Sequence, residues 1–158
     1  MKLKRRGLLI VGFLGMLLIM GCGDTARKQI LGEWRVASVE CDGKPDALFV
    51  SVAQTFTFTD DGYLTIEQKA IKEWEKIKPY QLIYSYKIGP GNNIDFVLPQ
   101  RHSQNFVYRG IFSLDGDSLR VCWVDPGNVP KAPRPTDFTT TVGDRRMLWV
   151  LNRAKPKH

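Results

Sequence analysis

The sequence has little of the chemistry that enzymes and metal sites need. It contains two histidines and three cysteines in 158 residues, and one histidine, His158, is the last residue. Catalytic zinc sites use sets of histidine ligands, so composition excludes a histidine-rich site. His102 lies in a polar stretch without a partner for proton transfer, which favours a solvated loop residue over a general base. With neither a Gly-x-Ser-x-Gly elbow nor a phosphate-binding glycine loop, we expect no enzyme, no catalytic residues, no metal and no cofactor.

The sequence also lacks an apolar run long enough to cross a membrane. Its most apolar stretch, residues 7–21, is uncharged and follows Lys2, Lys4, Arg5 and Arg6. A membrane-spanning helix needs about 20 apolar residues, whereas the apolar part of a secretory signal needs about 7 to 15. We therefore predict that residues 1–21 form a cleaved signal peptide. A retained hydrophobic anchor and a plain secretory peptide are the alternatives.

The end of the apolar run, Ile19-Met20-Gly21-Cys22, resembles a bacterial lipobox, in which a small residue precedes a cysteine. The resemblance implies that the Gly21–Cys22 bond is cut and that Cys22 carries a diacylglycerol as a thioether, a role that needs a nucleophilic sulfur. Several acyl chains attach a protein stably to a membrane. We therefore expect a lipid-anchored extracytoplasmic protein, on the periplasmic side of a membrane or at the cell surface.

The basic charge of the chain belongs mostly to this signal. The formal net charge is +7, from 23 Lys and Arg against 16 Asp and Glu. Four of those basic residues and no acidic residue lie within 1–21, so the mature chain would carry +3. Its remaining basic residues are mixed with acidic ones, as in Lys72, Glu73, Glu75 and Lys76. We therefore expect no nucleic-acid partner.

Most of the mature chain alternates apolar and polar residues between turn signals, the pattern of half-buried strands. In residues 54–59, Phe56 and Phe58 face one side and three threonines face the other. Turns such as Asp60-Asp61-Gly62 and Asp115-Gly116-Asp117 lack the later ligands of a calcium loop and predict hairpins. The pattern predicts an all-β antiparallel meander closed into a barrel of eight short strands: 32–40, 54–59, 63–67, 80–88, 94–98, 107–114, 118–124 and 147–153.

Three segments depart from this alternation. Residues 22–30 are interpreted as a polar tether. Residues 68–78 carry Ile71, Trp74 and Ile77 at a spacing of three, which predicts a short helix or loop packed over one end of the barrel. The alternative is a basic lid that also contacts lipid headgroups through Lys72, Lys76 and Lys78. Residues 126–135 contain four prolines and predict an ordered crossing loop.

Two cysteines remain besides Cys22, namely Cys41 and Cys122, and an oxidising compartment would allow a disulfide between them to persist. Alternation places Cys122 on the opposite face from Leu119, Val121 and Trp123, away from the interior. In a closed meander one strand would separate the two cysteines by about twice 4.8 Å, beyond the limit of roughly 7 Å for a disulfide. Two free thiols are therefore favoured over a disulfide.

Gly32-Glu33-Trp34 near the start and Arg153 near the end resemble the closure motif of lipocalin and calycin barrels. That resemblance implies that Arg153 covers the indole of Trp34 and closes the barrel floor. Residues 31–40, 42–45, 110–122, 133–138 and 147–153 are similar to a lipocalin-like domain family that is exported and occurs mainly in planctomycete bacteria, from which Cys41 and the 68–78 segment depart. The likeness spans roughly residues 30–154, so 31–154 are assigned to the barrel and 155–158 to a tail. It implies a fold and supplies no catalytic residues.

The interior of such a barrel is filled by side chains or holds one small ligand. Its predicted lining is bulky, which indicates a largely filled core with at most a shallow pocket at the mouth: Phe56, Phe58, Leu64, Tyr84, Phe96, Phe112 and Trp123, together with Trp34 and Ile66. Fold analogy favours a binding module for a small apolar ligand or an envelope component. The alternative is a structural or protein-interaction lipoprotein, an inhibitor or assembly factor, with a filled barrel and no small ligand.

Overall fold

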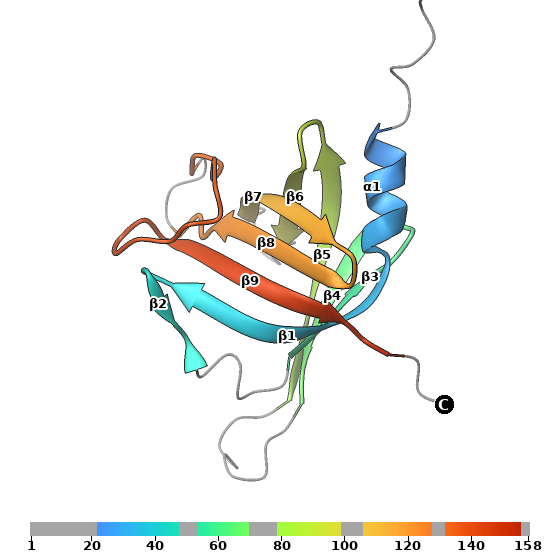
Figure 1. Ribbon diagram of the computed structural model, residues 1–158, viewed down its shortest axis with the longest axis horizontal. Helices are drawn as coiled ribbons and strands as arrows, with labels where there is room; N and C mark the ends of the chain where they lie inside the picture. The colour runs from blue at the N-terminus through green and yellow to red at the C-terminus, as the bar shows by residue number, and fades with distance from the viewer. Residues whose placement is uncertain (1–21, 48–53, 70–78, 99–105, 128–131, 156–158) are drawn as a thin grey trace, which may run out of the picture.

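A computed structural model describes residues 22–47, 54–69, 79–98, 106–127 and 132–155 of the chain (Figure 1). The predicted signal segment 1–21, the side chain of Cys22, most of the 68–78 segment and His102 lie outside the described residues. Within the described part of the chain, no helix has both the length and the apolar character needed to cross a membrane.

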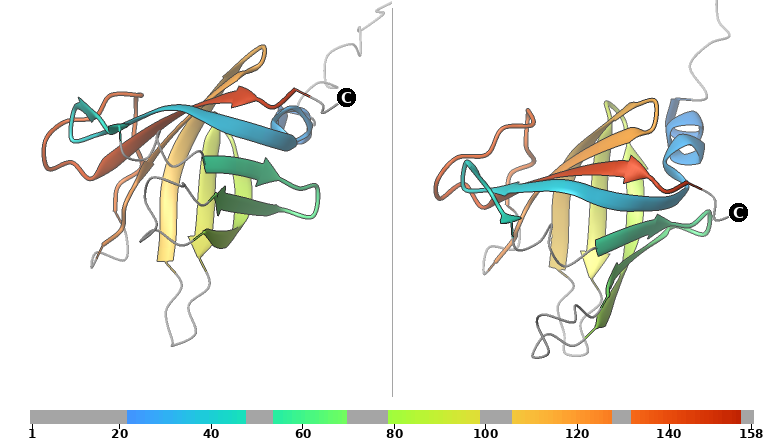
Figure 2. Two further views of the ribbon diagram at one scale, coloured as in Figure 1. Left: turned by 90° about the horizontal axis from the view of Figure 1, so that it is seen from below. Right: turned by 60° about the horizontal axis from the view of Figure 1, so that its bottom comes forward.

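The described chain is a closed antiparallel β-barrel, as the alternation predicts. The eight barrel strands are β1 (Gly32–Cys41), β3 (Gln54–Phe58), β4 (Tyr63–Gln68), β5 (Tyr80–Gly89), β6 (Asn93–Leu98), β7 (Phe106–Asp115), β8 (Ser118–Val124) and β9 (Arg146–Arg153). Each strand pairs with its neighbour in the sequence order, and β1 also pairs with β9, which closes the barrel. Figure 2 shows the strands wrapped around a common interior. A short strand, β2 (Lys44–Pro45), extends β1 as a hairpin outside this ring.

The expected strand positions and the closed antiparallel meander of eight strands are confirmed. Each predicted strand differs from the observed one by a single residue at most at either end. The turns at Asp60 and Asp115 join β3 to β4 and β7 to β8. Their glycines, Gly62 and Gly116, have φ values of 88° and 55°, which explains why glycine is required there. The long connections leave from the opposite end of the barrel, which we call the open end.

The segment predicted to be a polar tether is instead a helix, α1 (Cys22–Ile30). The helix packs against the end of the barrel where the short hairpin turns lie, which we call the closed end (Figure 1). Ile30 is fully buried in the main core, and Ala26 packs against it. Arg27 contacts Asp60 in the β3–β4 turn. Residues 22–30 are therefore part of the folded domain, because this nine-residue helix gains tertiary contacts that a free spacer lacks.

A second layer covers part of the outer face of the barrel, where the Arg120 guanidinium of β8 lies 4.5 Å from the centre of the Phe138 ring. Among the described residues of the 125–145 connection, Ala132, Pro135 and Thr140 are buried. Thr140 accepts a hydrogen bond from the backbone of Gly43 at 2.9 Å and donates one to Glu40 at 2.5 Å. This layer explains why Cys122, which the alternation places away from the interior, is nevertheless fully buried.

Arg134 anchors the same connection across β6 and β7. Its guanidinium lies 2.7 Å from Asp95 and donates to the carbonyls of Ile94 at 3.2 Å and Gly110 at 2.5 Å. Gly110 is required because a Cβ there would lie 2.7 Å from the Cys122 carbonyl oxygen. The proline-rich segment is thus held on the barrel wall by a side chain that satisfies carbonyls of two strands.

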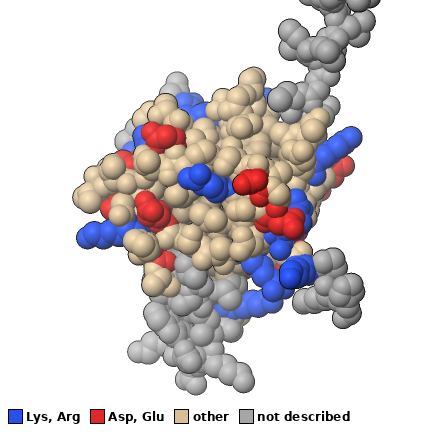
Figure 3. All heavy atoms as spheres, viewed as in Figure 1, with Lys and Arg blue, Asp and Glu red and all other residues tan. Residues whose placement is uncertain are grey.

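The charged surface is mixed in sign. On the face shown in Figure 3, Lys and Arg side chains are interspersed with Asp and Glu among uncharged residues. Most of the helix or loop expected over 68–78 lies outside the described residues. Its first residue, Gln68, is the last residue of β4. The helix α1 lies instead at the closed end.

Candidate functional site

The closed end is sealed around Trp34, the first inward-facing side chain of β1. Trp34 is fully buried, and its indole Nε1 donates to the carbonyl of Ile30 at 2.8 Å. The guanidinium carbon of Arg153, the last residue of β9, lies 4.1 Å from the centre of the Trp34 ring. Gly32 has a φ of 106°, which an L residue rarely adopts, so the chain passes from α1 into β1 through a position that needs glycine.

Arg153 also caps the end of α1, a role that the motif alone does not indicate. Its guanidinium donates to the carbonyls of Gln29 at 2.7 Å and Leu31 at 3.0 Å, and it lies 3.2 Å from Asp117 in the β7–β8 turn. The last carbonyls of a helix lack partners within the helix, so an arginine there stabilises the helix end. Gly32, Trp34 and Arg153 therefore form a structural floor shared by the barrel and the helix.

The predicted lining residues all lie in the barrel core. Each is at most 8% exposed: Phe56, Phe58, Leu64, Tyr84, Phe96, Phe112 and Trp123. Several of their rings contact one another edge to face, as do Phe96 and Trp123 with 5.1 Å between centroids, whereas Phe56 is stacked on Trp123. Tyr108 and Trp149 belong to the same aromatic cluster, at 5.6 Å from Tyr84 and 5.5 Å from Trp123. Alternation along β7 and β9 was the signal that could have found these two.

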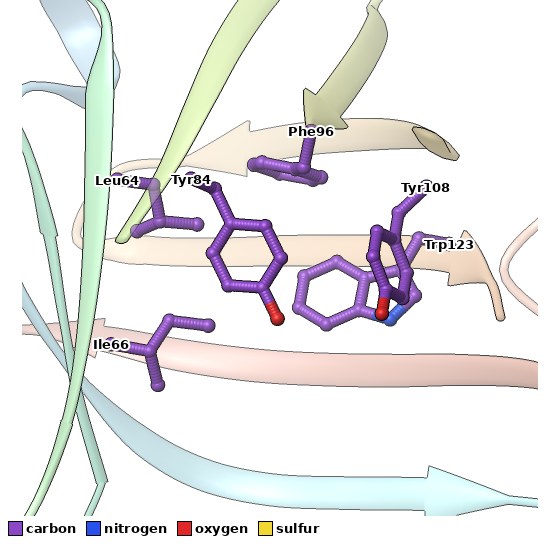
Figure 4. Close-up of a pocket in the computed structure, with 6 residues that line it drawn as sticks. All are labelled: Leu64, Ile66, Tyr84, Phe96, Tyr108 and Trp123. Atoms are coloured by element: carbon purple, nitrogen blue, oxygen red, sulfur yellow. The ribbon is translucent and has the colours of Figure 1, made fainter. Parts of the chain in front are cut away.

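A small space remains between six of these side chains: Leu64, Ile66, Tyr84, Phe96, Tyr108 and Trp123 (Figure 4). The gaps between their atoms add up to about 150 Å³, a volume that includes space open to solvent. No part of the space has room for a water molecule. Tyr108 and Trp123 lie near the open-end termini of β7 and β8, so the space is closest to the outside at that end. The barrel in this state is filled, and a ligand would have to displace aromatic rings.

Tyrosine hydroxyls give this apolar space a polar side. Burial raises the pKa of Tyr84 above its ordinary value, and the nearby hydroxyls of Tyr108 and Tyr80 add to that rise. Burial also raises the pKa values of Tyr80 and Tyr108. All three phenols therefore stay protonated around neutral pH and can donate a hydrogen bond. The open end offers neutral donors beside apolar rings.

Two buried glutamines lie at the open-end termini of their strands. Gln54 is 2% exposed and Gln68 is 5% exposed, and they are register partners on β3 and β4. Gln54 shares the inward face of β3 with Phe56, and Gln68 shares that of β4 with Ile66. The amide nitrogen of Gln54 donates to the Tyr80 hydroxyl at 3.2 Å. The Gln54 oxygen Oε1 and the Gln68 nitrogen Nε2 are buried without a hydrogen-bond partner.

Unpaired buried amide atoms are costly, at about 1–3 kcal/mol each. Native proteins keep few of them, and a binding site is one place where they occur. The pair was missed at the level of the sequence because glutamines at strand ends match no motif. The available signal was that each glutamine falls on the apolar side of its strand in the period-two pattern.

The two described cysteines show no sign of reactivity. Both are free, and β9 lies between them because Cys41 pairs with Met147 and Cys122 with Leu148. Burial raises the pKa of each thiol to about 11, with nearby Asp46 and Asp42 contributing for Cys41. Both thiols are therefore protonated at neutral pH and are poor nucleophiles.

Other reactive or metal-binding chemistry is scarce in the described residues. Within them, no group of three or more His, Cys, Asp and Glu side chains could hold a metal ion. An open hollow outside the barrel, next to β2, is lined by Cys41, Asp42, Lys44, Pro45, Asp46, Ala47 and Val142. It lies away from the glutamines and the aromatic cluster.

Comparisons with known proteins add little to this geometry. No protein-family model matches the sequence, and no curated protein matches it. Among solved structures, the chain is similar to a point mutant of the fluorescent protein UnaG, with 12% identity and a TM-score of 0.43 over 82% of this chain and 99% of that one. A second point mutant of the same protein aligns with 12% identity and a TM-score of 0.40 over 80% of this chain and 97% of that one.

Proposed function

We propose that this protein is a binding module for a small, mainly apolar molecule that inserts among the aromatic side chains of the barrel. The observation that carries the proposal is the set of gaps between Tyr84, Tyr108, Trp123 and three apolar side chains, about 150 Å³ in sum and partly open to solvent. Ligand sites are typically apolar with a few polar groups that fix orientation. The phenols of Tyr84 and Tyr108 are placed to do this.

Binding requires the rings to move, since the space has no room for a water molecule. Tyr84 and Tyr108 meet edge to face at 5.6 Å, and both come from strands that bound the space. A rotation of either side chain would enlarge the space toward the open end without breaking the strand pairing. A flat two-ring aromatic molecule suits such a slot between rings.

Filling the space is expected to abolish binding. Ile66→Phe places a larger side chain in the lining, so it should lower the affinity for naphthalene, measured by calorimetry, at least about tenfold. Overpacking costs about 1–3 kcal/mol, so near-ultraviolet circular dichroism should confirm that the variant is folded. Ile83→Phe is the matched control, because Ile83 lies on the outer side of adjacent β5 and is 48% exposed. Equal affinities of both folded variants and the wild type would contradict the proposed site.

A structural or protein-interaction role is the second candidate, and the filled interior favours it. Such a lipoprotein would use its outer surface and bind no small ligand. Native mass spectrometry of the protein purified from its own envelope separates the two roles. A bound small molecule supports the binding module, whereas a stoichiometric protein partner with an empty barrel supports the alternative.

The proposal includes a lipid anchor on Cys22 and an extracytoplasmic location. The basic residues before 7–21 and the Gly21-Cys22 pair support it. Since α1 begins at Cys22 and packs on the closed end, such an anchor would hold that end toward the bilayer, with one short helix between them. Cys22→Ala should move the protein out of the membrane fraction or block cleavage after Gly21. The variant should also fail to incorporate radiolabelled palmitate when cells are grown with it. Retained label would contradict lipidation at this residue.

A further inference from the structure

We propose that Gln54 and Gln68 recognise an adjacent hydrogen-bond donor and acceptor on the ligand, as in a lactam or a primary carboxamide attached to a flat apolar ring. This inference rests on the proposed function and names the class of ligand that the same site takes. It starts from the two amide atoms that the barrel buries without a partner, Gln54 Oε1 and Gln68 Nε2.

The two glutamines are placed to act together. They are direct register partners on β3 and β4, so their Cβ atoms lie about 4.5–5.5 Å apart on the same inner face. One offers an unused acceptor and the other an unused donor. A group that carries N–H and C=O on neighbouring atoms matches this pair, with its N–H donating to Gln54 Oε1 and its C=O accepting from Gln68 Nε2.

The pair lies beside the apolar space rather than apart from it. Gln68 is two residues after Ile66 on the inward face of β4, and Ile66 lines the space. Gln54 is held by the Tyr80 hydroxyl, and Tyr80 is close enough to Tyr84 to raise the pKa of its phenol. A ring system between Tyr84 and Trp123 would therefore carry its polar edge toward the glutamines at the open end.

A carboxylate ligand fits these residues less well. The buried side chains at the open end are neutral amides and phenols, whose phenol pKa values burial raises. A buried anion needs a cationic partner or several donors to offset desolvation. An unpaired acceptor such as Gln54 Oε1 repels an anion, and it attracts an N–H. The chemistry therefore selects a neutral ligand with both hydrogen-bonding roles.

The test compares two probes of nearly the same shape on the mature domain. 2-Quinolinone carries an adjacent N–H and C=O, and naphthalene carries neither. Calorimetry with the wild type should show 2-quinolinone binding about tenfold more tightly, since a net hydrogen bond corresponds to a factor of roughly two to ten in affinity. Gln68→Leu should lower the 2-quinolinone affinity about three- to tenfold and leave the naphthalene affinity unchanged. Gln81→Leu is the matched control, because Gln81 lies exposed on the outer side of β5 and bonds Glu67.

The outcomes separate this inference from the proposed function. If naphthalene and 2-quinolinone bind equally, and Ile66→Phe blocks both, the site stands and the amide recognition is overturned. If neither probe binds the wild type, the proposed function and this inference both fall. Melting temperature gives a readout independent of any probe: Gln68→Leu should raise it, because an unpaired buried amide is removed, whereas Gln81→Leu should not. A lower melting temperature for Gln68→Leu would show the amide already satisfied in the free protein and overturn the inference.

Discussion

Replacing Trp34 by alanine is expected to lower the free energy of unfolding by about 3–5 kcal/mol, the largest effect of any single substitution considered for this barrel. The indole is fully buried where β1 meets α1, and its removal leaves a cavity at the closed end. The change also removes the hydrogen bond to the Ile30 carbonyl and the surface on which Arg153 lies at 4.1 Å. Chemical denaturation followed by far-ultraviolet circular dichroism measures the loss.

Two milder variants separate the contributions at this floor. Trp34→Phe keeps an aromatic ring but loses the Nε1 donor, so it should cost less than the alanine variant. Arg153→Lys loses the planar guanidinium that bonds Gln29 and Leu31 and covers the indole, and should cost about 1–2 kcal/mol. Arg35→Lys is its control, since Arg35 is exposed beside Glu33 at 3.8 Å and should change stability little. Equal small effects of both arginine variants would show that the closure contact contributes no stability.

Replacing Ile30 by alanine is expected to cost about 2–4 kcal/mol. Ile30 is the last residue of α1 and is fully buried against the barrel core, although it belongs to the segment predicted to be a spacer. Its loss removes the main apolar contact that holds the helix on the closed end, where Arg27 adds polar contacts with Asp60 and Tyr86. Thermal and denaturant unfolding of the domain beginning at Gly23 would measure the change.

Lys28→Ala is the matched control, because Lys28 is exposed on the same helix and the substitution keeps helix propensity. We expect it to stay within about 0.5 kcal/mol of the wild type. If Ile30→Ala and Lys28→Ala behaved alike, α1 would be detached from the barrel in solution. Residues 22–30 would then act as the spacer that their polar composition suggests.

The aromatic interior has two roles, because the same rings stabilise the fold and line the candidate site. Phe96, Trp123 and Tyr84 pack edge to face and fill the barrel, yet two of the rings that line the space belong to tyrosines, and Tyr108 lies near the open end. Rings that can rotate allow the barrel to be filled by its own side chains when no ligand is bound. The same rings can turn aside to make room for a ligand. This is why the probes above are flat and aromatic.

Alternation and turn chemistry were enough to predict the eight strands, because each strand has one face in the core and one outside. In β3, buried Phe56 and Phe58 alternate with threonines, and the glycine turns demand positive φ. The same rule placed Cys122 away from the interior. These features are local in the sequence, so the sequence by itself determined them.

Three features depended on contacts between distant segments. The helix α1 is too short to be stable alone and forms against the barrel, where Arg153 and Trp34 take its last carbonyls. Cys122 is buried because the 125–145 connection folds back over the outer face of β8, where Phe138 lies against Arg120. The pairing of Gln54 with Gln68 exists only once β3 and β4 are in register. The strand pattern is therefore a property of the sequence, whereas the sealed floor and the candidate recognition pair were decided by the tertiary structure, because each requires atoms that only barrel closure or strand pairing brings within hydrogen-bonding range.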